Sequence, residues 1–225
     1  MPKTDSFETH TERYDAWFET HRYAFESELQ AVRTLLPHNG RGVEIGVGTG
    51  QFAAKLGIAV GVEPSAAMRQ LAGRRGVEAI DGVAEALPLP DASVDYALMV
   101  TTVCFLDDID AAFAEVYRVL APGGAFVVGL IDRESLLGQE YQRRKRRNVF
   151  YKEAVFHSAS EVESALRHAG FRKLRAVQTI FEDPEHMIQV DPVKPGYGKG
   201  VFVVFCGTKS KRGTSPTARK RGGRT

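Results

Sequence analysis

Three glycines spaced two residues apart give this sequence its clearest chemical signal. They lie in Val43-Glu44-Ile45-Gly46-Val47-Gly48-Thr49-Gly50, after a short apolar run and before a helical stretch that begins near Gln51. Glycine allows a tight turn and a close approach of backbone to ligand, and a helix N-terminus offers free amides. The loop therefore predicts a binding site, while its structural alternative is a plain turn between a strand and a helix.

A carboxylate follows at a spacing that favours binding. The next apolar run, residues 58–62, ends at Glu63, thirteen residues after Gly50. In doubly wound sheets ligands lie across the carboxyl ends of the strands, where a carboxylate can accept two hydrogen bonds from a ribose diol. The alternative is an exposed residue just before a helix that starts at Ser65. A nicotinamide dinucleotide is disfavoured, because Gln51 stands where its fingerprint has a third glycine.

Apolar runs and helical stretches alternate along the chain and predict the elements that position these residues. The strand-like runs are 42–45, 58–62, 77–80, 94–100, 124–130, 174–181 and 201–206. Their alternation with helices predicts an α/β fold with a doubly wound, mostly parallel, Rossmann-like sheet. The last two runs have no helix between them, so we expect an antiparallel C-terminal hairpin at the sheet edge. Asp110, and Ser160 with Glu163, are the expected starts of two helices.

Charge and composition distinguish the ends of the chain from its body, and they exclude several classes of protein. Residues 1–36 are expected to be helical, and residues 207–225 to be a disordered basic tail, which holds seven Lys and Arg and no acid. The remaining 23 of 30 basic residues face 28 acidic ones, so the body is mildly acidic. The apolar runs are too short for a membrane span, and the residues at the start of the sequence lead us to expect no secretory signal. Two cysteines predict neither a disulfide framework nor a zinc site, so we expect a cytoplasmic protein without a metal.

Five ordered motifs carry a resemblance to a known family. They are Glu44–Gly50, Gly61–Ser65, Gly82–Asp91, Val94–Tyr96 and Glu115–Gly124. With them the chain resembles the class I S-adenosylmethionine-dependent methyltransferases, especially the small-molecule branch typified by ubiquinone/menaquinone biosynthesis enzymes. The resemblance implies S-adenosyl-L-methionine as cofactor and a seven-stranded sheet. It also implies a methyltransferase domain over residues 37–206, with a cap insertion at about 132–157 and residues 1–36 as a lid.

The same resemblance implies a set of cofactor-binding positions. These are Glu44, Gly46, Gly48, Gly50, Glu63, Pro64, Val83, Ala84, Glu85 and Thr101. Glu44 and the glycine loop would hold the methionine portion, Glu63 the ribose hydroxyls, and Thr101 would border the acceptor. The family often has Asp at the position of Val83, so here a side-chain hydrogen bond to adenine is missing. For Glu85 the alternative is a cap on the following turn.

The acceptor side is less defined. Methyl transfer from a sulfonium needs alignment above all, and a base only when the acceptor starts protonated. Tyr14 and His21 are the catalytic candidates in segment 14–21, whose aromatic side chains could close over the sulfonium. The alternatives are a helix that packs Trp17 and Phe18 into the core, and a structural histidine.

Two basic segments leave the class of acceptor open. Residues Arg143–Arg147 are all Lys or Arg, and the tail is basic. Either could bring a weak contact with a polyanion, or each could be a solvated surface. We therefore expect a small-molecule methyl acceptor, with an RNA or protein methyltransferase and a non-catalytic S-adenosylmethionine-binding module as alternatives.

Overall fold

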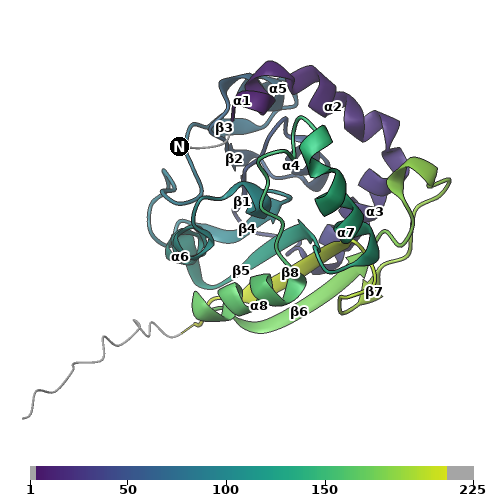
Figure 1. Cartoon of the computed structure of the whole chain (residues 1–225). Coiled ribbons are helices and arrows are strands. Elements are labelled where there is room, and N and C mark those ends of the chain that lie inside the picture. The colour runs from purple at the N-terminus through teal and green to yellow at the C-terminus, as the bar shows by residue number, and fades with distance from the viewer. Residues whose placement is uncertain (1–3, 212–225) are drawn as a thin grey trace, which may run out of the picture.

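An eight-stranded sheet forms the centre of the molecule (Figure 1). The computed structural model describes residues 4–211. The strands are β1 (Gly42–Ile45), β2 (Val60–Val62), β3 (Glu78–Ile80), β4 (Val94–Val100), β5 (Leu120–Ile131), β6 (Arg172–Thr179), β7 (Lys194–Pro195) and β8 (Phe202–Thr208). Their order is β3-β2-β1-β4-β5-β8-β6-β7. The first five pair in parallel, whereas β8 is antiparallel to both β5 and β6.

The predicted fold class is confirmed, with two additions. The last two long strands, β6 and β8, form the expected antiparallel pair, and β8 lies inside the sheet beside β5. The eighth strand, β7, has two residues and adds to the edge of β6. Strand β8 continues to Thr208, into the segment expected as tail. The expected tail from residue 212 onward lies outside the described residues.

Helices cover both faces of the sheet. In the described part of the chain they are α1 (Asp5–Thr9), α2 (Thr11–Thr20), α3 (Arg22–Leu35), α4 (Gln51–Leu56), α5 (Ala66–Arg74), α6 (Ile109–Val119), α7 (Leu136–Arg144) and α8 (Ala159–His168). Three short 3₁₀ turns lie in the connections between elements: η1 (Val103–Phe105), η2 (Lys145–Arg147) and η3 (Pro184–His186). The N-terminal stretch expected as helical is thus three helices, with breaks at His10 and His21.

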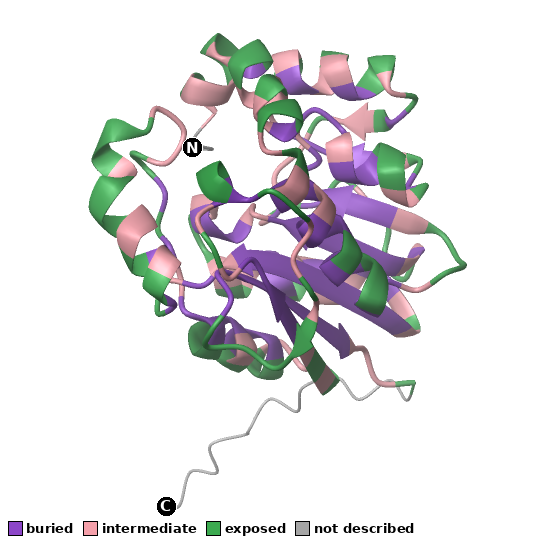
Figure 2. Cartoon of the chain, turned by 90° about the vertical axis from the view of Figure 1, so that its right-hand side faces the viewer, coloured by how far each residue is buried: buried purple, intermediate pink, exposed green. Residues whose placement is uncertain are grey.

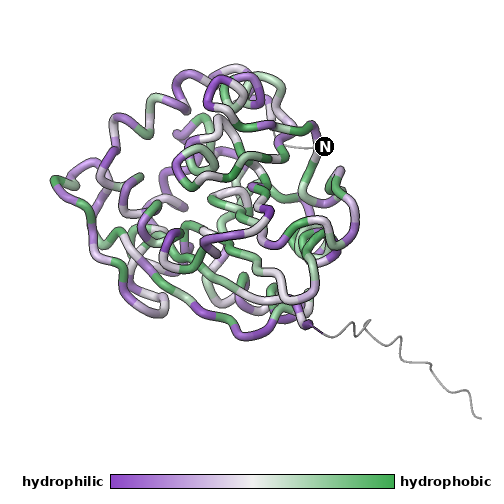
Figure 3. Tube along the Cα trace, turned by 180° about the vertical axis from the view of Figure 1, so that it is seen from behind, coloured by the Kyte–Doolittle hydropathy of each residue, from purple (hydrophilic) through white to green (hydrophobic). Residues whose placement is uncertain are grey.

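The core has two halves, one on each face of the sheet. Side chains alternate along β4, so that Leu98 packs toward α3 and α4 while Met99 packs toward α6 and α8. On the second face the rings of Phe113 and Phe126 meet edge to face with centroids 5.1 Å apart. Figures 2 and 3 show the buried, hydrophobic strands inside and the polar helix faces outside. Each fully buried large side chain stabilises the fold by about 1.5–3 kcal/mol.

Two helix starts differ from the sequence expectation by two residues each. The N-cap of α6 is Asp108, whose carboxylate accepts hydrogen bonds from the amides of Asp110 and Ala111. The N-cap of α8 is Ser158, which forms a complete capping box with Glu161. The predictions of Asp110 and Ser160 as caps were therefore wrong. Each segment contains two polar residues that could cap the helix N-terminus. The packing of the helix on the sheet decides that the first of the two, Asp108 or Ser158, is the N-cap.

The corrected cap of α8 predicts a difference between two neighbouring serines. Ser158→Ala should lower the free energy of unfolding by about 0.5–2 kcal/mol, because the Glu161 amide loses its acceptor. Ser160→Ala is the comparison at an exposed position: it removes the 2.9 Å contact with the Ser158 hydroxyl but no bond to a helix amide, and should change that free energy by less than about 0.5 kcal/mol. Urea unfolding of both variants measures the difference. Equal effects, or a larger effect at Ser160, would contradict the assignment.

Candidate active site

The glycine loop leaves β1 in a backbone conformation that side chains rarely adopt. Gly46, Gly48 and Gly50 have φ angles of 70°, 53° and 81°. A Cβ on Gly46 would lie 2.3 Å from the Thr102 hydroxyl, so this position also requires glycine for packing. A Cβ on Gly48 would meet only the Tyr14 ring, at 3.8 Å. Gly48 therefore forms the floor of an open space, whereas Gly46 is packed tightly.

Glu63 ties the glycine loop to the end of β2. Its carboxylate accepts one hydrogen bond from the Gly48 amide at 3.0 Å and another from the Ser65 amide at 2.9 Å. Its exposed fraction is 8%, so the alternative of an exposed residue before a helix is wrong. Burial raises the pKa of Glu63 above its ordinary value, while the two amides and the charge of Arg69 act in the opposite direction.

A first cavity of about 320 Å³ lies above these residues. The sequence-predicted residues that line it are Gly46, Gly48, Glu63, Pro64, Val83, Ala84, Glu85, Thr101 and Tyr14. Glu85 also accepts hydrogen bonds from the amides of Asp107 and Asp108, so it supports the loop before α6 as well. Sequence reasoning did not assign to this site Phe7, Val62, Met68, Gly82, Val100, Thr102, Phe105, Leu106 and Asp107, which complete the lining. Of these, the quoted motifs contain Val62, in Gly61–Ser65, and Gly82, in Gly82–Asp91.

Two predicted positions stand apart from this lining. Gly50 precedes α4 in a left-handed conformation, with its α-carbon facing Ala72. Glu44 is buried beneath the loop, and its Oε2 has no hydrogen-bond partner among the described residues. Burial raises the pKa of Glu44 well above its ordinary value, and the Glu63 charge adds to this. The structure therefore places most of the predicted cofactor-binding residues around one cavity, but Gly50 and Glu44 do not line it.

The N-terminal helices are attached over the first cavity by two carboxylates. Asp15 of α2 accepts hydrogen bonds from Thr49 and Gln51 at 2.7 and 2.9 Å and forms an ion pair with Arg75 at 2.6 Å. Glu8 of α1 accepts from the Ala66 amide, the first of α5, at 2.6 Å. Burial alone would raise the pKa of Asp15, but these hydrogen bonds and the Arg75 charge lower it below its ordinary value.

Aromatic contacts also hold α1 and α2 over the first cavity. The Phe7 ring meets Phe105 edge to face at 5.0 Å and stacks on Phe150 at 5.6 Å. Tyr14 contacts Phe150 at 5.5 Å, so α1, α2 and the segment after η2 meet in one aromatic group. Phe18 is buried against Phe25 and Phe52, as the structural alternative for this segment expects, while its neighbour Trp17 lines a second cavity.

The second cavity, of about 510 Å³, adjoins the first. Tyr14 and Thr101 line both cavities. Thr101 is a β-branched residue with a φ of 51°, a strained backbone conformation of the kind that is found at functional sites. Burial raises the pKa of Tyr14 above its ordinary value. His21 also lines the second cavity, where its ring stacks on Trp17 and its Nδ1 lies 3.2 Å from the Trp17 carbonyl oxygen.

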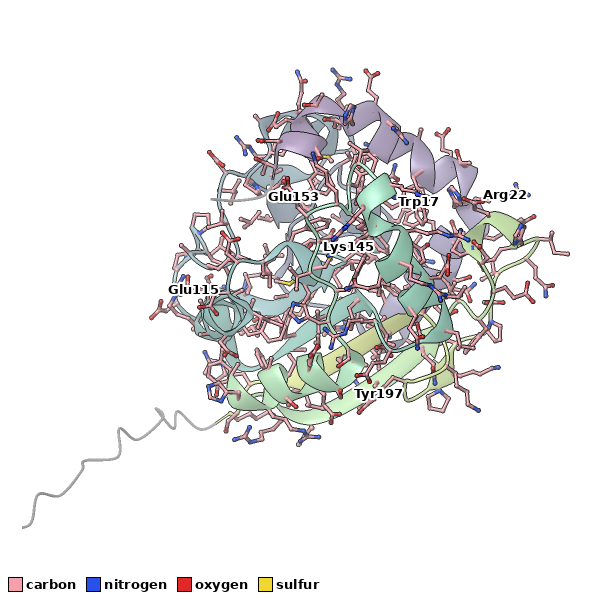
Figure 4. The ribbon with its side chains drawn as sticks, in the orientation of Figure 1. Trp17, Arg22, Glu115, Lys145, Glu153 and Tyr197 are labelled. Carbon is pink, nitrogen blue, oxygen red and sulfur yellow. The ribbon has the colours of Figure 1, made fainter. Side chains whose placement is uncertain are left out.

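The walls of the second cavity come from segments far apart in the sequence. Figure 4 shows Trp17 of α2 and Lys145, which follows α7, on the same side of the molecule. The residues from α3 and the C-terminal half that face it include Glu28, Tyr141, Tyr151, Ile180, Asp183 and Phe202. Glu28 was missed by sequence reasoning, because a single acid on an amphipathic helix is usually exposed. Here its exposed fraction is 8%.

The basic run after the fifth strand is partly neutralised by its own surroundings. Arg143 and Arg144 both pair with Glu140, and the Lys145 ammonium donates a hydrogen bond to the Ala154 carbonyl at 2.7 Å. Within residues 4–211 there is no group of three side chains that could hold a metal ion. No helix in that range is long and apolar enough to cross a membrane.

Comparisons with known proteins agree on one family. Residues 43–128 match the methyltransferase domain family. A solved structure from Thermotoga maritima, described as a SAM-dependent methyltransferase and possible histamine N-methyltransferase, is 53% identical with a TM-score of 0.90, covering 92% of this chain and all of that one. An uncharacterised protein of Methanocaldococcus jannaschii is 40% identical over 90% of this chain and 98% of its own length. A malonyl-[acyl-carrier protein] O-methyltransferase of Methylococcus capsulatus is 30% identical over 72% of this chain and 62% of its own.

The contacts of Asp15 predict that one carboxylate holds α2 against the glycine loop. Asp15→Ala should increase hydrogen exchange of residues 5–20 by at least about tenfold, because three donors lose their shared acceptor. Glu12→Ala, at an exposed position of the same helix, is the control and should leave exchange unchanged. Hydrogen-exchange mass spectrometry measures both. Equal protection of wild type and Asp15→Ala would show that other contacts hold this helix.

Proposed function

We propose that this chain, which belongs to the S-adenosylmethionine-dependent methyltransferases, transfers a methyl group to a small-molecule acceptor bound in the second cavity. The chain is an enzyme, and its cofactor is S-adenosyl-L-methionine. The single observation that supports the choice of acceptor is the pair of adjoining cavities, which meet at Tyr14 and Thr101. A volume of about 510 Å³ lies within the range of small-molecule sites.

The residues around the first cavity fit the cofactor. The open space above Gly48 accepts a ligand close to the backbone, and Glu63 has lone pairs beyond the two that the amides use. Glu63 would bind the ribose hydroxyls, the backbone near Gly48 the methionine portion, and Val83 with Ala84 the adenine ring. When bound, S-adenosylmethionine supplies the methyl group as an electrophile on its sulfonium.

The protein's contribution is alignment and exclusion of water. Tyr14 and Thr101, which border both cavities, would fix the acceptor against the methyl group, and such alignment can lower a barrier by about 7–11 kcal/mol. We propose that α1 and α2 act as a lid, because Glu8 and Asp15 attach them over the first cavity. The insertion at 132–157 would cap the acceptor side, since Leu137, Tyr141 and Tyr151 line the second cavity.

A small acceptor is favoured over a macromolecule by the charge distribution. Arg143 and Arg144, the start of the basic run, share the carboxylate of Glu140 and so present less free positive charge. The Thermotoga maritima protein is described as a possible histamine N-methyltransferase, and histamine is itself a small molecule. Both observations support an acceptor that fits inside the cavity.

Two substitutions test the cofactor cradle. Glu63→Ala and Gly48→Val should each weaken S-adenosylmethionine binding at least about tenfold, because one removes a charged hydrogen-bond acceptor and the other fills the open floor. Glu78→Ala, an exposed acid on β3, is the control and should bind like wild type. Isothermal titration calorimetry measures the affinities. Wild-type protein that shows no saturable binding would refute the function.

A metabolite screen tests the acceptor. Incubation with S-adenosylmethionine labelled in its methyl group should transfer the label to a component of a small-molecule extract, and Gly48→Val should abolish the transfer. Folded RNA and denatured protein are offered in parallel. Labelling of either macromolecule in place of the small molecules would overturn this part of the proposal.

A further inference from the structure

One buried carboxyl group in the second cavity has no hydrogen-bond or ion-pair partner in the described part of the chain. Glu28 of α3 lines that cavity, and no described residue donates a hydrogen bond to its carboxyl group or forms an ion pair with it. Burial raises the pKa of Glu28 to about 8. A buried carboxyl group without a partner destabilises a fold, and such groups call for an explanation. A ligand of the cavity would provide the missing partner.

The cationic side chains around this cavity do not provide it. Arg144 is paired with Glu140, and the Lys145 ammonium is bound to the Ala154 carbonyl. Arg13 of α2 also lines the cavity and is exposed. The His21 imidazole is held at the wall by Trp17, through its stacked ring and the 3.2 Å contact with the carbonyl oxygen.

The remaining titratable groups make the far wall negative. Burial is the largest cause that raises the pKa of Tyr141, and the charges of Glu28, Asp183 and Glu185 raise it further. These three acids therefore lie near the Tyr141 phenol. Neither Asp183 nor Glu185 forms an ion pair within residues 4–211. Tyr151, whose pKa burial also raises, packs edge to face with Tyr141 at 6.1 Å. Aromatic faces and unpaired carboxylates together attract a cation.

We infer that Glu28 selects an amine as the methyl acceptor, binding its ammonium form and accepting the proton that the nitrogen must lose. This inference rests on the proposed function and names the acceptor class for the same cavity. The ammonium would occupy the space that Glu28 shares with Trp17, Tyr14 and Tyr141. An alcohol of the same shape can donate a hydrogen bond to Glu28 but offers no positive charge, and a carboxylate of that shape would be repelled.

The reaction balances with groups already named. The ammonium gives one proton to the Glu28 carboxylate, which frees the nitrogen lone pair. The nitrogen then forms a bond to the methyl carbon while the carbon–sulfur bond breaks, and that electron pair stays on sulfur. The products are a methylated ammonium and S-adenosylhomocysteine, and the protonated Glu28 releases its proton to water when the products leave.

Two small ligands of the same shape, one an amine and one an alcohol, test the inference. Trp17 is the chain's one tryptophan and lines the cavity, so its fluorescence reports binding there. With S-adenosylhomocysteine saturating, wild type should bind 2-phenylethylamine at least about tenfold more tightly than 2-phenylethanol at pH 8. Glu28→Gln should reduce this preference to within about twofold. Glu19→Gln, an exposed acid of α2, is the matched control and should keep it.

The pH profile separates an ionising Glu28 from a merely structural one. Below its pKa of about 8 the carboxyl group is neutral and cannot pair with an ammonium. The amine affinity of wild type should therefore rise between about pH 6 and about pH 8.5, and that of Glu28→Gln should stay flat. Glu28→Gln should also fold, with a free energy of unfolding at pH 8 no lower than that of wild type, because it no longer buries a charge.

The outcomes distinguish the two claims. If S-adenosylhomocysteine does not bind in calorimetry, the proposed function fails. If it binds but wild type shows no preference for the amine, or binds neither probe, the inference about Glu28 fails alone. Retention of the preference, or of the pH dependence, by a folded Glu28→Gln protein would overturn it as well.

Discussion

The two hydrogen bonds from backbone amides to the Glu63 carboxylate are the interaction on which the site depends. They join the loop after β1 to the turn after β2, two segments that the parallel sheet brings to one edge. Glycine at position 48 is needed both for the left-handed turn and for the open floor above it. The Glu63 side chain and the glycine loop thus create a rigid binding site, in which carboxylate lone pairs remain free for a ligand.

Other segments of the chain enclose the two cavities around this site. Helices α1 and α2 are attached over the first cavity by the carboxylates of Glu8 and Asp15 and by aromatic contacts, and Phe18 also anchors α2 in the core. The strained backbone of Thr101 stands between the two cavities, at the end of β4. A methyl donor on one side and an acceptor on the other would meet at this residue.

The sequence predicted the parts that local pattern determines. Strands β1 and β4 match the expected runs residue for residue, because both are mostly apolar and, apart from Gly42 and Asp95, buried. Glu63 was recognisable because its spacing from the glycine loop follows from the strand–helix–strand unit. The caps Asp108 and Ser158 were displaced by two residues, since neighbouring polar residues compete and only packing decides. Glu28 was not recognisable, because Tyr141, Asp183 and Phe202, which line the same cavity, lie more than a hundred residues away from it in the chain.

The most direct test of the central claim is a crystal structure of this protein with S-adenosylhomocysteine. We expect the adenosyl group in the first cavity, with a Glu63 carboxylate oxygen within about 3.2 Å of each ribose hydroxyl. Density for the nucleoside elsewhere, or a Glu63 side chain turned away from it, would contradict the account.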